Sequence, residues 1–139
     1  MILLDTSGLL AALDASQQSH ADAATSLTSA RSPLVLSPFV LAELDYLLAT
    51  RVGHGAQSDM LAEVDRGAYT LTPMTAGDVG KAQKLIARHV DLRIGLADAS
   101  IVVLAERHNT LDVLTLDQRH FRVLSANGKP FRILPADAD

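Results

Sequence analysis

The sequence predicts an α/β domain in which helices sandwich a mostly parallel central sheet. Short apolar runs of strand length alternate with longer segments whose apolar residues recur at helical spacing. No internal repeat or low-complexity tract interrupts this alternation. With 139 residues, of which 48% are apolar, the chain is long enough to bury one continuous core. We therefore expect a single domain over residues 1–139.

The first quarter of the chain predicts two strands with two helices between them. Met1–Leu4 is an apolar run that stops at Asp5, as a buried strand would. Leu9–Leu13 is helical in pattern, and the alanines of His20–Ala30 favour a second helix. Leu34–Leu36 is again a short apolar run, so we expect the second strand there.

The second quarter is expected to be helical. Ser37 is a suitable N-cap and Pro38 suits the first turn, so a helix should cover Phe39–Arg51. The glycines in Gly53–Gly55 predict a loop, after which Ala56–Asp65 should form a separate helix.

The second half repeats the alternation. Tyr69–Leu71 is the third expected strand, and Thr75–His89 has the apolar spacing of an amphipathic helix. A further helix is expected at Leu96–His108. Val113–Leu116 and Phe131–Leu134 are the last expected strands, the latter flanked by glycine and proline.

Four acidic residues stand out against this pattern. Asp5 and Asp117 directly follow expected strands, and ligands of parallel sheets bind outside the carboxyl ends of the strands. Glu43 and Asp98 share the apolar stripes of their helices, which should turn both inward, whereas Asp45 should point away. Burying unpaired carboxylates is costly, so four converging acids predict a compensating divalent cation.

The donor chemistry narrows the choice of cation. Taken singly, each acid has an ordinary explanation: Asp5 and Asp117 as caps or turn residues, Asp98 as a residue suited to the positive end of a helix, and Glu43 as a surface residue near the edge of its stripe. Together they form an oxygen-rich set that prefers Mg²⁺ or Mn²⁺. The chain contains no cysteine, and its five histidines are scattered. Only His120, three residues after Asp117, lies close in sequence to one of these four acids. Thr6, Ser7 and Thr115 are candidates for hydrogen bonds to a carboxylate or to water on the cation.

Charge and hydropathy limit the partners. A net charge of −4 excludes a general polycation, and an aromatic content of 4% disfavours a base-stacking platform. Lys81, Lys84 and Arg88 recur at helical spacing, which is most simply a solvated helix face. The N-terminal segment lacks a basic region, and no apolar run has membrane-spanning length. We expect a cytoplasmic protein that does not bind a membrane.

The motifs around the acids resemble those of the PIN-domain ribonucleases, in particular the VapC-type toxins of bacterial toxin–antitoxin pairs. The resemblance spans nearly the whole chain, through ILLDTSGLLAAL, SPFVLAELDYLL, LADASIVVLAE and TLDQRHF. Each motif is short, but the four occur in the family's order. Some members carry another acid shortly after the third motif, where this chain has Ser100, Ile101 and Val102.

The resemblance implies a function. Asp5, Glu43, Asp98 and Asp117 match the family's catalytic and metal-binding acids, and Thr6 or Ser7 matches the hydroxyl residue after the first acid. The implied activity is Mg²⁺- or Mn²⁺-dependent endoribonuclease cleavage by a metal-activated water, leaving 5′-phosphate and 3′-hydroxyl ends. The implied partners are an RNA substrate, a VapB-like antitoxin and a second copy of the chain. Arg93 and Arg119 flank the last two acidic motifs and are candidates for contacts to RNA phosphate.

Two other functions fit parts of the pattern. Aspartate-based phosphotransfer domains also place Asp at the end of the first strand. A receiver domain, however, needs paired acids there, and the related phosphatases need a second Asp where this chain has Ser7. A non-catalytic PIN-like binding module is the other alternative, and stabilisation by Mg²⁺ or Mn²⁺ would distinguish it from an enzyme.

Overall fold

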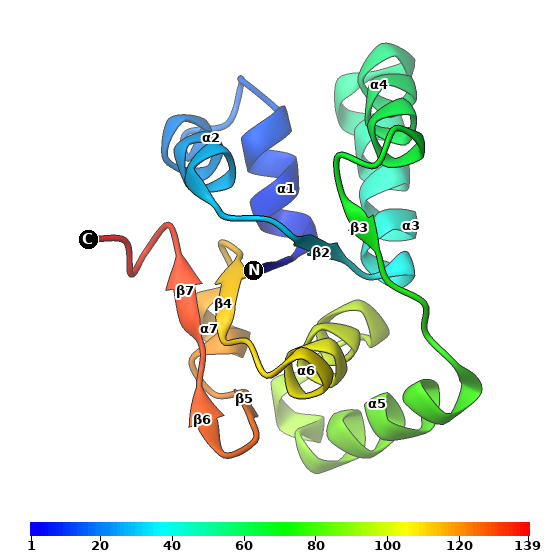
Figure 1. The fold of residues 1–139 in the computed structure, drawn as a ribbon, viewed down its shortest axis with the longest axis vertical. Helices are drawn as coiled ribbons and strands as arrows, with labels where there is room; N and C mark the ends of the chain where they lie inside the picture. The colour runs from blue at the N-terminus through cyan, green and yellow to red at the C-terminus, as the bar shows by residue number, and fades with distance from the viewer.

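A five-stranded parallel sheet forms the centre of the molecule, which is described over residues 1–139 by a computed structural model (Figure 1). The strands lie in the order β3-β2-β1-β4-β7, and every pair is parallel. Their bounds are β1 Ile2–Leu4, β2 Leu34–Leu36, β3 Thr70–Leu71, β4 Asp112–Leu114 and β7 Arg132–Leu134. This architecture confirms the α/β fold class predicted from the alternating pattern.

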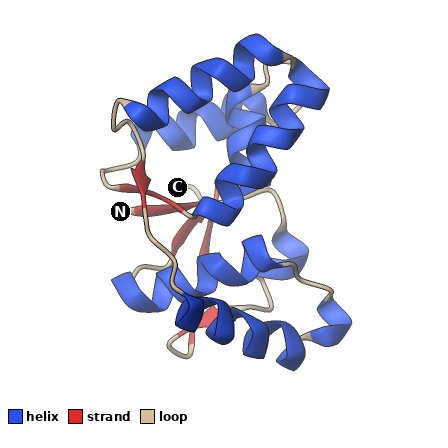
Figure 2. Cartoon of the chain, turned by 90° about the vertical axis from the view of Figure 1, so that its right-hand side faces the viewer, coloured by secondary structure: helices blue, strands red, loops and turns tan.

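Helices cover both faces of the sheet (Figure 2). On one side lie α1 and α2, and on the other α6 packs next to the sheet with α5 outside it (Figure 1). The helical segments are α1 Thr6–Leu13, α2 His20–Ser29, α3 Pro38–Leu47, the π-helical turn η1 Leu48–Val52, α4 His54–Asp65, α5 Ala76–Arg88, the 3₁₀ turn η2 Val90–Leu92, α6 Leu96–His108 and α7 Gln118–Phe121.

The core combines the short strands with the buried side of α6. All of β1 and the last two residues of β2 and of β4 are almost entirely inaccessible, and α6 contributes the run Ala99–Ala105. A helix buried this extensively needs apolar residues on most of its circumference, which explains why its sequence is so rich in alanine, valine and isoleucine. None of the helices is long and apolar enough to span a membrane.

Gly8 sets the distance between α1 and the sheet. A Cβ atom at this position would collide with the carbonyl group of Leu114, at the end of β4. Glycine therefore allows the first turn of α1 to pack directly on the backbone of β4. The direct parallel pairing of β1 with β4 brings the ends of these strands, which precede Asp5 and Asp117, to the same edge of the sheet.

Several expected boundaries differ from the observed ones. The expected loop Gly53–Gly55 was largely wrong, because α4 already begins at His54 and only Gly53, with φ of 140°, breaks the helix. The fourth strand ends at Leu114 instead of Leu116. Its chain leaves the sheet because the backbone N–H of Leu116 donates to Ser7 Oγ instead of to a strand, at 2.9 Å.

A small hairpin near the C-terminus was not expected. Its strands are β5 Ser125–Ala126 and β6 Lys129–Pro130, joined by Asn127 and Gly128. Both turn residues have positive φ, at 51° and 75°, as a two-residue hairpin turn requires. The Asn-Gly dipeptide is a strong sequence signal for this turn, although the flanking strands are too short to show a pattern.

Candidate metal centre

Asp5 occupies the carboxyl end of β1, where it is 4% exposed. Its Oδ2 atom accepts hydrogen bonds from Thr115 Oγ1 at 2.6 Å and from Ser7 Oγ at 2.9 Å. Burial raises the pKa of Asp5 to about 6, and the nearby charge of Asp98 adds to the effect, while the Thr115 and Ser7 hydrogen bonds oppose it. The carboxyl group is therefore rigidly held but electrostatically unfavourable when ionised.

The two hydroxyl groups that hold Asp5 also shape the chain that leads to Asp117. Thr115 Oγ1 accepts from the backbone N–H of Asp117 at 2.9 Å, and Ser7 Oγ accepts from the N–H of Leu116 at 2.9 Å. Neither hydroxyl group forms a hydrogen bond with the carboxylate of Asp117. Ser7 and Thr115 thus connect the end of β1 with the end of β4.

Thr6 contributes a different feature. Its side chain is buried beside Asp5, and its Oγ1 atom has no hydrogen-bond partner. A buried hydroxyl without a partner is unusual, because it loses its hydrogen bonds to water without replacement.

Asp98 lies in the first turn of α6, as predicted. Its Oδ2 atom accepts from the backbone N–H of Gly95 at 3.1 Å, so it also caps the helix. Burial raises the pKa of Asp98; the charges of Asp117 and Glu43 act in the same direction, whereas the Gly95 hydrogen bond and His120 oppose it. Its carboxylate is thus surrounded by more negative charge than the protein compensates.

Asp117 is the N-cap of α7 and accepts from the backbone N–H of His120 at 3.0 Å. The imidazole of His120 lies over both acids: Nδ1 is 2.8 Å from Asp117 Oδ2 and 3.5 Å from Asp98 Oδ2. Neither approach has hydrogen-bond geometry, so this buried nitrogen is left without a hydrogen-bond partner. One potential ligand atom from each of Asp98, Asp117 and His120 lies within 4.8 Å of the others.

The cluster of potential metal ligands therefore includes a ring nitrogen in addition to the expected carboxylate oxygens. A histidine nitrogen stands among the carboxylates, although only one histidine does so. In the sequence, His120 could be recognised by its position three residues after Asp117. This spacing places it on the first turn of a helix that Asp117 caps.

Glu43 corrects one expectation. It is exposed on α3 instead of buried in the apolar stripe, because α3 packs through Val40 and Leu44, and the stripe continues into Leu48 of η1. Its charge nevertheless acts on Asp98, which places it on the same side of the molecule as the acids. Asp45 does point elsewhere, since its Oδ1 accepts from Gln57 Nε2 of α4 at 2.8 Å.

The remaining candidates are the two arginines. Arg93 is exposed after η2 with φ of 56°, and Arg119 is exposed on α7. Neither forms an ion pair with a carboxylate. The structure thus leaves both guanidinium groups free in solvent and does not bring them into the acid cluster.

Comparison with known proteins places the chain in a family. The sequence model of the PIN domain matches residues 2–126. The chain belongs to the PIN-domain family. It is 44% identical over 135 residues to ribonuclease VapC26 of Mycobacterium tuberculosis, covering 96% of this chain and 100% of that protein. The resemblance to VapC-type PIN domains is therefore confirmed.

Solved structures agree on the fold of this PIN domain. The toxin VapC20 of Mycobacterium tuberculosis, described as cleaving the sarcin–ricin loop, superimposes with a TM-score of 0.79 at 24% identity, over 84% of this chain and 90% of that one. FitAcB of Neisseria gonorrhoeae superimposes with a TM-score of 0.60 at 22% identity, over 85% of this chain and 88% of that one.

Proposed function

We propose that this PIN domain is a divalent-metal-dependent endoribonuclease and acts as the toxin of a toxin–antitoxin pair in the cytoplasm. The observation that carries the proposal is the cluster of Asp98, Asp117 and His120 beside the buried Asp5. These groups converge at the edge of the sheet where ligands of parallel sheets bind. The names of its relatives, a ribonuclease and a toxin, support RNA as the substrate.

The residues present fit a bound Mg²⁺ or Mn²⁺. Asp98 and Asp117 would supply carboxylate oxygens, and His120 a ring nitrogen. The raised pKa of Asp5 and of Asp98 and the unpartnered Thr6 and His120 atoms all indicate a site that lacks positive charge and ligand contacts. When bound, a divalent cation supplies Lewis-acid polarisation of a phosphoryl oxygen and lowers the pKa of water.

The chain's own groups would position the reaction. Thr115 and Ser7 hold the Asp5 carboxylate in one orientation, and Gly95 and the first turn of α6 hold Asp98. Glu43 is exposed and unpaired, so it can reach a substrate or a water molecule that approaches from solvent. Because water is the nucleophile in this proposal, the RNA 2′-hydroxyl is not consumed and the products carry 5′-phosphate and 3′-hydroxyl ends.

The antitoxin is proposed to be a VapB-like protein. A cluster of carboxylates attracts an arginine or lysine from a partner, and a guanidinium can bind one carboxylate through two hydrogen bonds. Exposed apolar side chains also offer a protein-binding surface, because Val79, Val90 and Leu96 are 39%, 67% and 37% exposed. We propose that such surfaces are covered by the antitoxin and by a second copy of the chain.

The test compares acid variants on RNA isolated from cells. Asp98→Asn and Asp117→Asn should each abolish most cleavage in Mn²⁺, because each removes charge from the same cation site. Asp45→Asn is the matched control, since its carboxylate binds Gln57 on the far side of α3 and its loss should leave cleavage intact. End-mapping should find no 2′,3′-cyclic phosphate, and EDTA should stop the reaction.

The outcomes decide between an enzyme and a binding module. Full activity in both acid variants, or cyclic phosphate ends in EDTA, would contradict the proposed mechanism. RNA binding without cleavage in any divalent cation would instead identify a non-catalytic module. For the toxin role, induction of the chain alone should arrest growth, and co-expression of its cognate antitoxin should relieve the arrest.

A further inference from the structure

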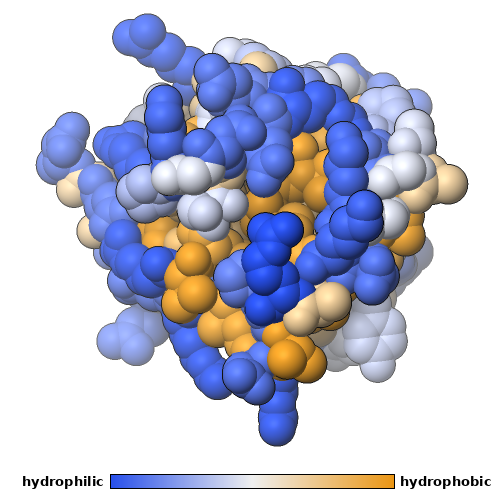
Figure 3. Space-filling view, turned by 90° about the horizontal axis from the view of Figure 1, so that it is seen from below, coloured by the Kyte–Doolittle hydropathy of each residue, from blue (hydrophilic) through white to orange (hydrophobic).

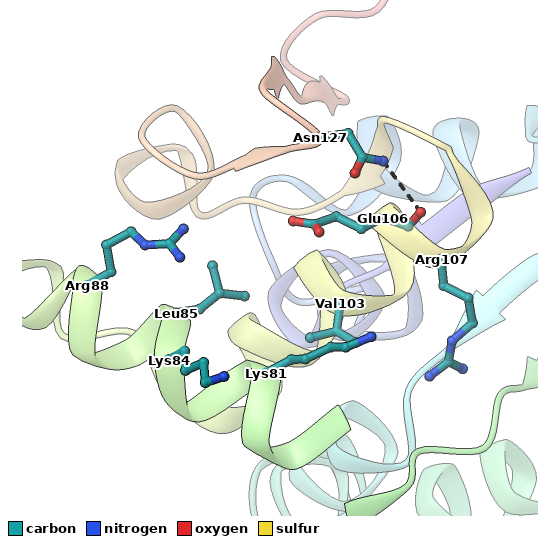
Figure 4. Close-up of a pocket in the computed structure, with 8 residues that line it drawn as sticks. All are labelled: Lys81, Lys84, Leu85, Arg88, Val103, Glu106, Arg107 and Asn127. Atoms are coloured by element: carbon teal, nitrogen blue, oxygen red, sulfur yellow. Dashed lines mark hydrogen bonds between the residues drawn. The ribbon is translucent and has the colours of Figure 1, made fainter. Parts of the chain in front are cut away.

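A cavity of about 540 Å³ lies between α5, α6 and the tip of the β5–β6 hairpin (Figure 4). Lys81, Lys84 and Arg88 line it from α5, and Glu106 and Arg107 line it from α6. None of these residues belongs to the acid cluster. Seen from below, this side of the molecule has hydrophilic side chains around apolar surface (Figure 3).

The cavity carries uncompensated positive charge. Arg107 is already engaged, because its guanidinium forms an ion pair with Asp78 and donates to the carbonyl of Pro73 at 2.9 Å. No carboxylate lies within 4 Å of Lys81, Lys84 or Arg88. Glu106 is the only acid in the lining, so three free cations face one carboxylate. This local excess occurs in a chain whose net charge is −4.

The three cations form a row along α5. Their spacing of three and four residues puts them on one face of the helix, and the row is about 10 Å long at 1.5 Å per residue. The opposite wall is fixed, since Asn127 at the hairpin tip donates from Nδ2 to the carbonyl of Glu106 at 3.4 Å. The cavity thus presents several positive charges in a row, unlike a pocket that binds one anion.

The lining favours a polyanion over a protein segment. Only Leu85 and Val103 are apolar, so there is no pocket of the kind that holds the aromatic or aliphatic anchor of a protein partner. No aromatic ring is present on which a base could stack, which limits contacts to the nucleic-acid backbone. Lysine side chains act as flexible point charges, which suits phosphates whose positions vary.

The same helix connects this cavity with the acid cluster. Asp98 is in the first turn of α6, and Glu106 is eight residues later, about 12 Å along the axis and about 80° around it. A single RNA strand that curves around α6 can therefore reach both places.

We propose that the cavity binds backbone phosphates of the RNA strand next to the bond that is cut. The inference rests on the proposed ribonuclease function and adds to it a second contact region, independent of base sequence, that anchors the substrate. It also accounts for how a chain with net negative charge and a cluster of carboxylates retains RNA, whose backbone those acids repel.

The test measures binding of a labelled 20-nucleotide single-stranded RNA in EDTA, at 50 to 200 mM KCl. The test variant is Lys81→Gln/Lys84→Gln/Arg88→Gln. The control variant, Arg31→Gln/Arg51→Gln/Arg66→Gln, removes the same charge from three exposed arginines that also have no ion pair and lie outside the cavity. Three lost phosphate contacts should reduce the slope of log affinity against log salt by about two, at roughly 0.7 per contact for single strands.

A variant with the opposite change in charge tests whether misfolding, instead of lost charge, explains weaker RNA binding by the α5 variant. Glu106→Gln removes the one carboxylate of the cavity, so it should tighten RNA binding while the triple α5 variant weakens it. In Mn²⁺, the α5 variant should cleave the 20-nucleotide RNA less efficiently through a higher KM. It should cleave a dinucleotide RNA, whose only backbone phosphate is the one that is cut, at the wild-type rate.

The possible failures are distinguishable. Wild-type cleavage together with an unchanged salt slope in the α5 variant would overturn the inference and leave the proposed function standing. Absence of both RNA binding and cleavage in the wild type would overturn both. If the α5 variant kept its RNA affinity but bound the antitoxin more weakly, the cavity would belong to the protein partner instead.

Discussion

Replacing Asp5 by asparagine should stabilise the metal-free protein at pH 8 and not at pH 4. Burial raises the pKa of Asp5 from 3.8 to about 6, so the folded protein holds this proton more tightly than the unfolded chain does. A raised carboxyl pKa means that stability is lost as pH rises through the window from about 4 to about 6. Above that window the ionised group costs about 3 kcal/mol, at 1.36 kcal/mol per pKa unit.

Asparagine removes this cost because it has the shape of the carboxylate but cannot ionise. Its carbonyl oxygen can occupy the position of Oδ2 and accept from Thr115 and Ser7. At pH 8 in EDTA the melting temperature should therefore rise by roughly 10 °C, if about 3 °C corresponds to 1 kcal/mol in a domain of this size. At pH 4, where the wild-type carboxyl is largely protonated, the two proteins should have the same melting temperature.

Metal binding should narrow the difference in stability between the wild type and the variant. Binding of Mn²⁺ to the native wild type at a hundredfold excess over Kd adds about 2.7 kcal/mol, and the variant should gain less because one charge near the site is missing. The assay is differential scanning calorimetry at pH 4 and pH 8, in EDTA and in Mn²⁺. Asp45→Asn, with the same chemical change on the side of α3 that contacts α4, is the control.

Equal or lower stability of Asp5→Asn at pH 8 in EDTA would refute this reasoning. That result would mean that the hydrogen bonds from Thr115 and Ser7 outweigh the burial of the charge, and that Asp5 is a structural residue held in its ionised form. The absence of repulsion would in turn remove one of the reasons to place a cation next to it.

Three further outcomes are expected. His120→Gln should lower Mn²⁺ affinity by roughly ten- to a hundredfold, measured by calorimetric titration, because its imidazole lies against two acids. Gly8→Ala should cost about 1–3 kcal/mol in urea unfolding, since the obstacle is the rigid Leu114 carbonyl. Asp78→Asn should lower the melting temperature at pH 7 but not at pH 2. The Thr75 backbone and Arg107 hold the pKa of Asp78 at about 2, so its contribution is lost as pH falls from about 4 towards 2.

Each of these outcomes has its own counter-result. Unchanged Mn²⁺ affinity in His120→Gln would show that the imidazole only packs over the acids. Gly80→Ala is the control for Gly8→Ala, because a Cβ at this helical position meets open space and should stabilise α5 by about 0.5–1 kcal/mol. A destabilisation of Asp78→Asn that persists at pH 2 would indicate a packing defect instead of a lost charge.

Much of this molecule was determined by local sequence patterns. The parallel sheet followed from short apolar runs separated by helical segments, because the two periodicities depend only on backbone geometry. The location of Asp5 after β1 and of Asp98 in the first turn of α6 followed from the same patterns. Element boundaries were less accurate, as at Leu114, because there a side-chain hydroxyl replaced a strand partner.

The tertiary structure decided what the local patterns leave open. His120 meets Asp98 only because α7, a helix of four residues too short to show a period, folds back over the start of α6. Glu43 is exposed because α3 packs through a stripe centred one residue away. The row from Lys81 to Arg88 lines a cavity only because α6 and the hairpin tip stand opposite it. In each case the decisive contact joins separate elements, and helical or strand periodicity carries no information about which elements will meet.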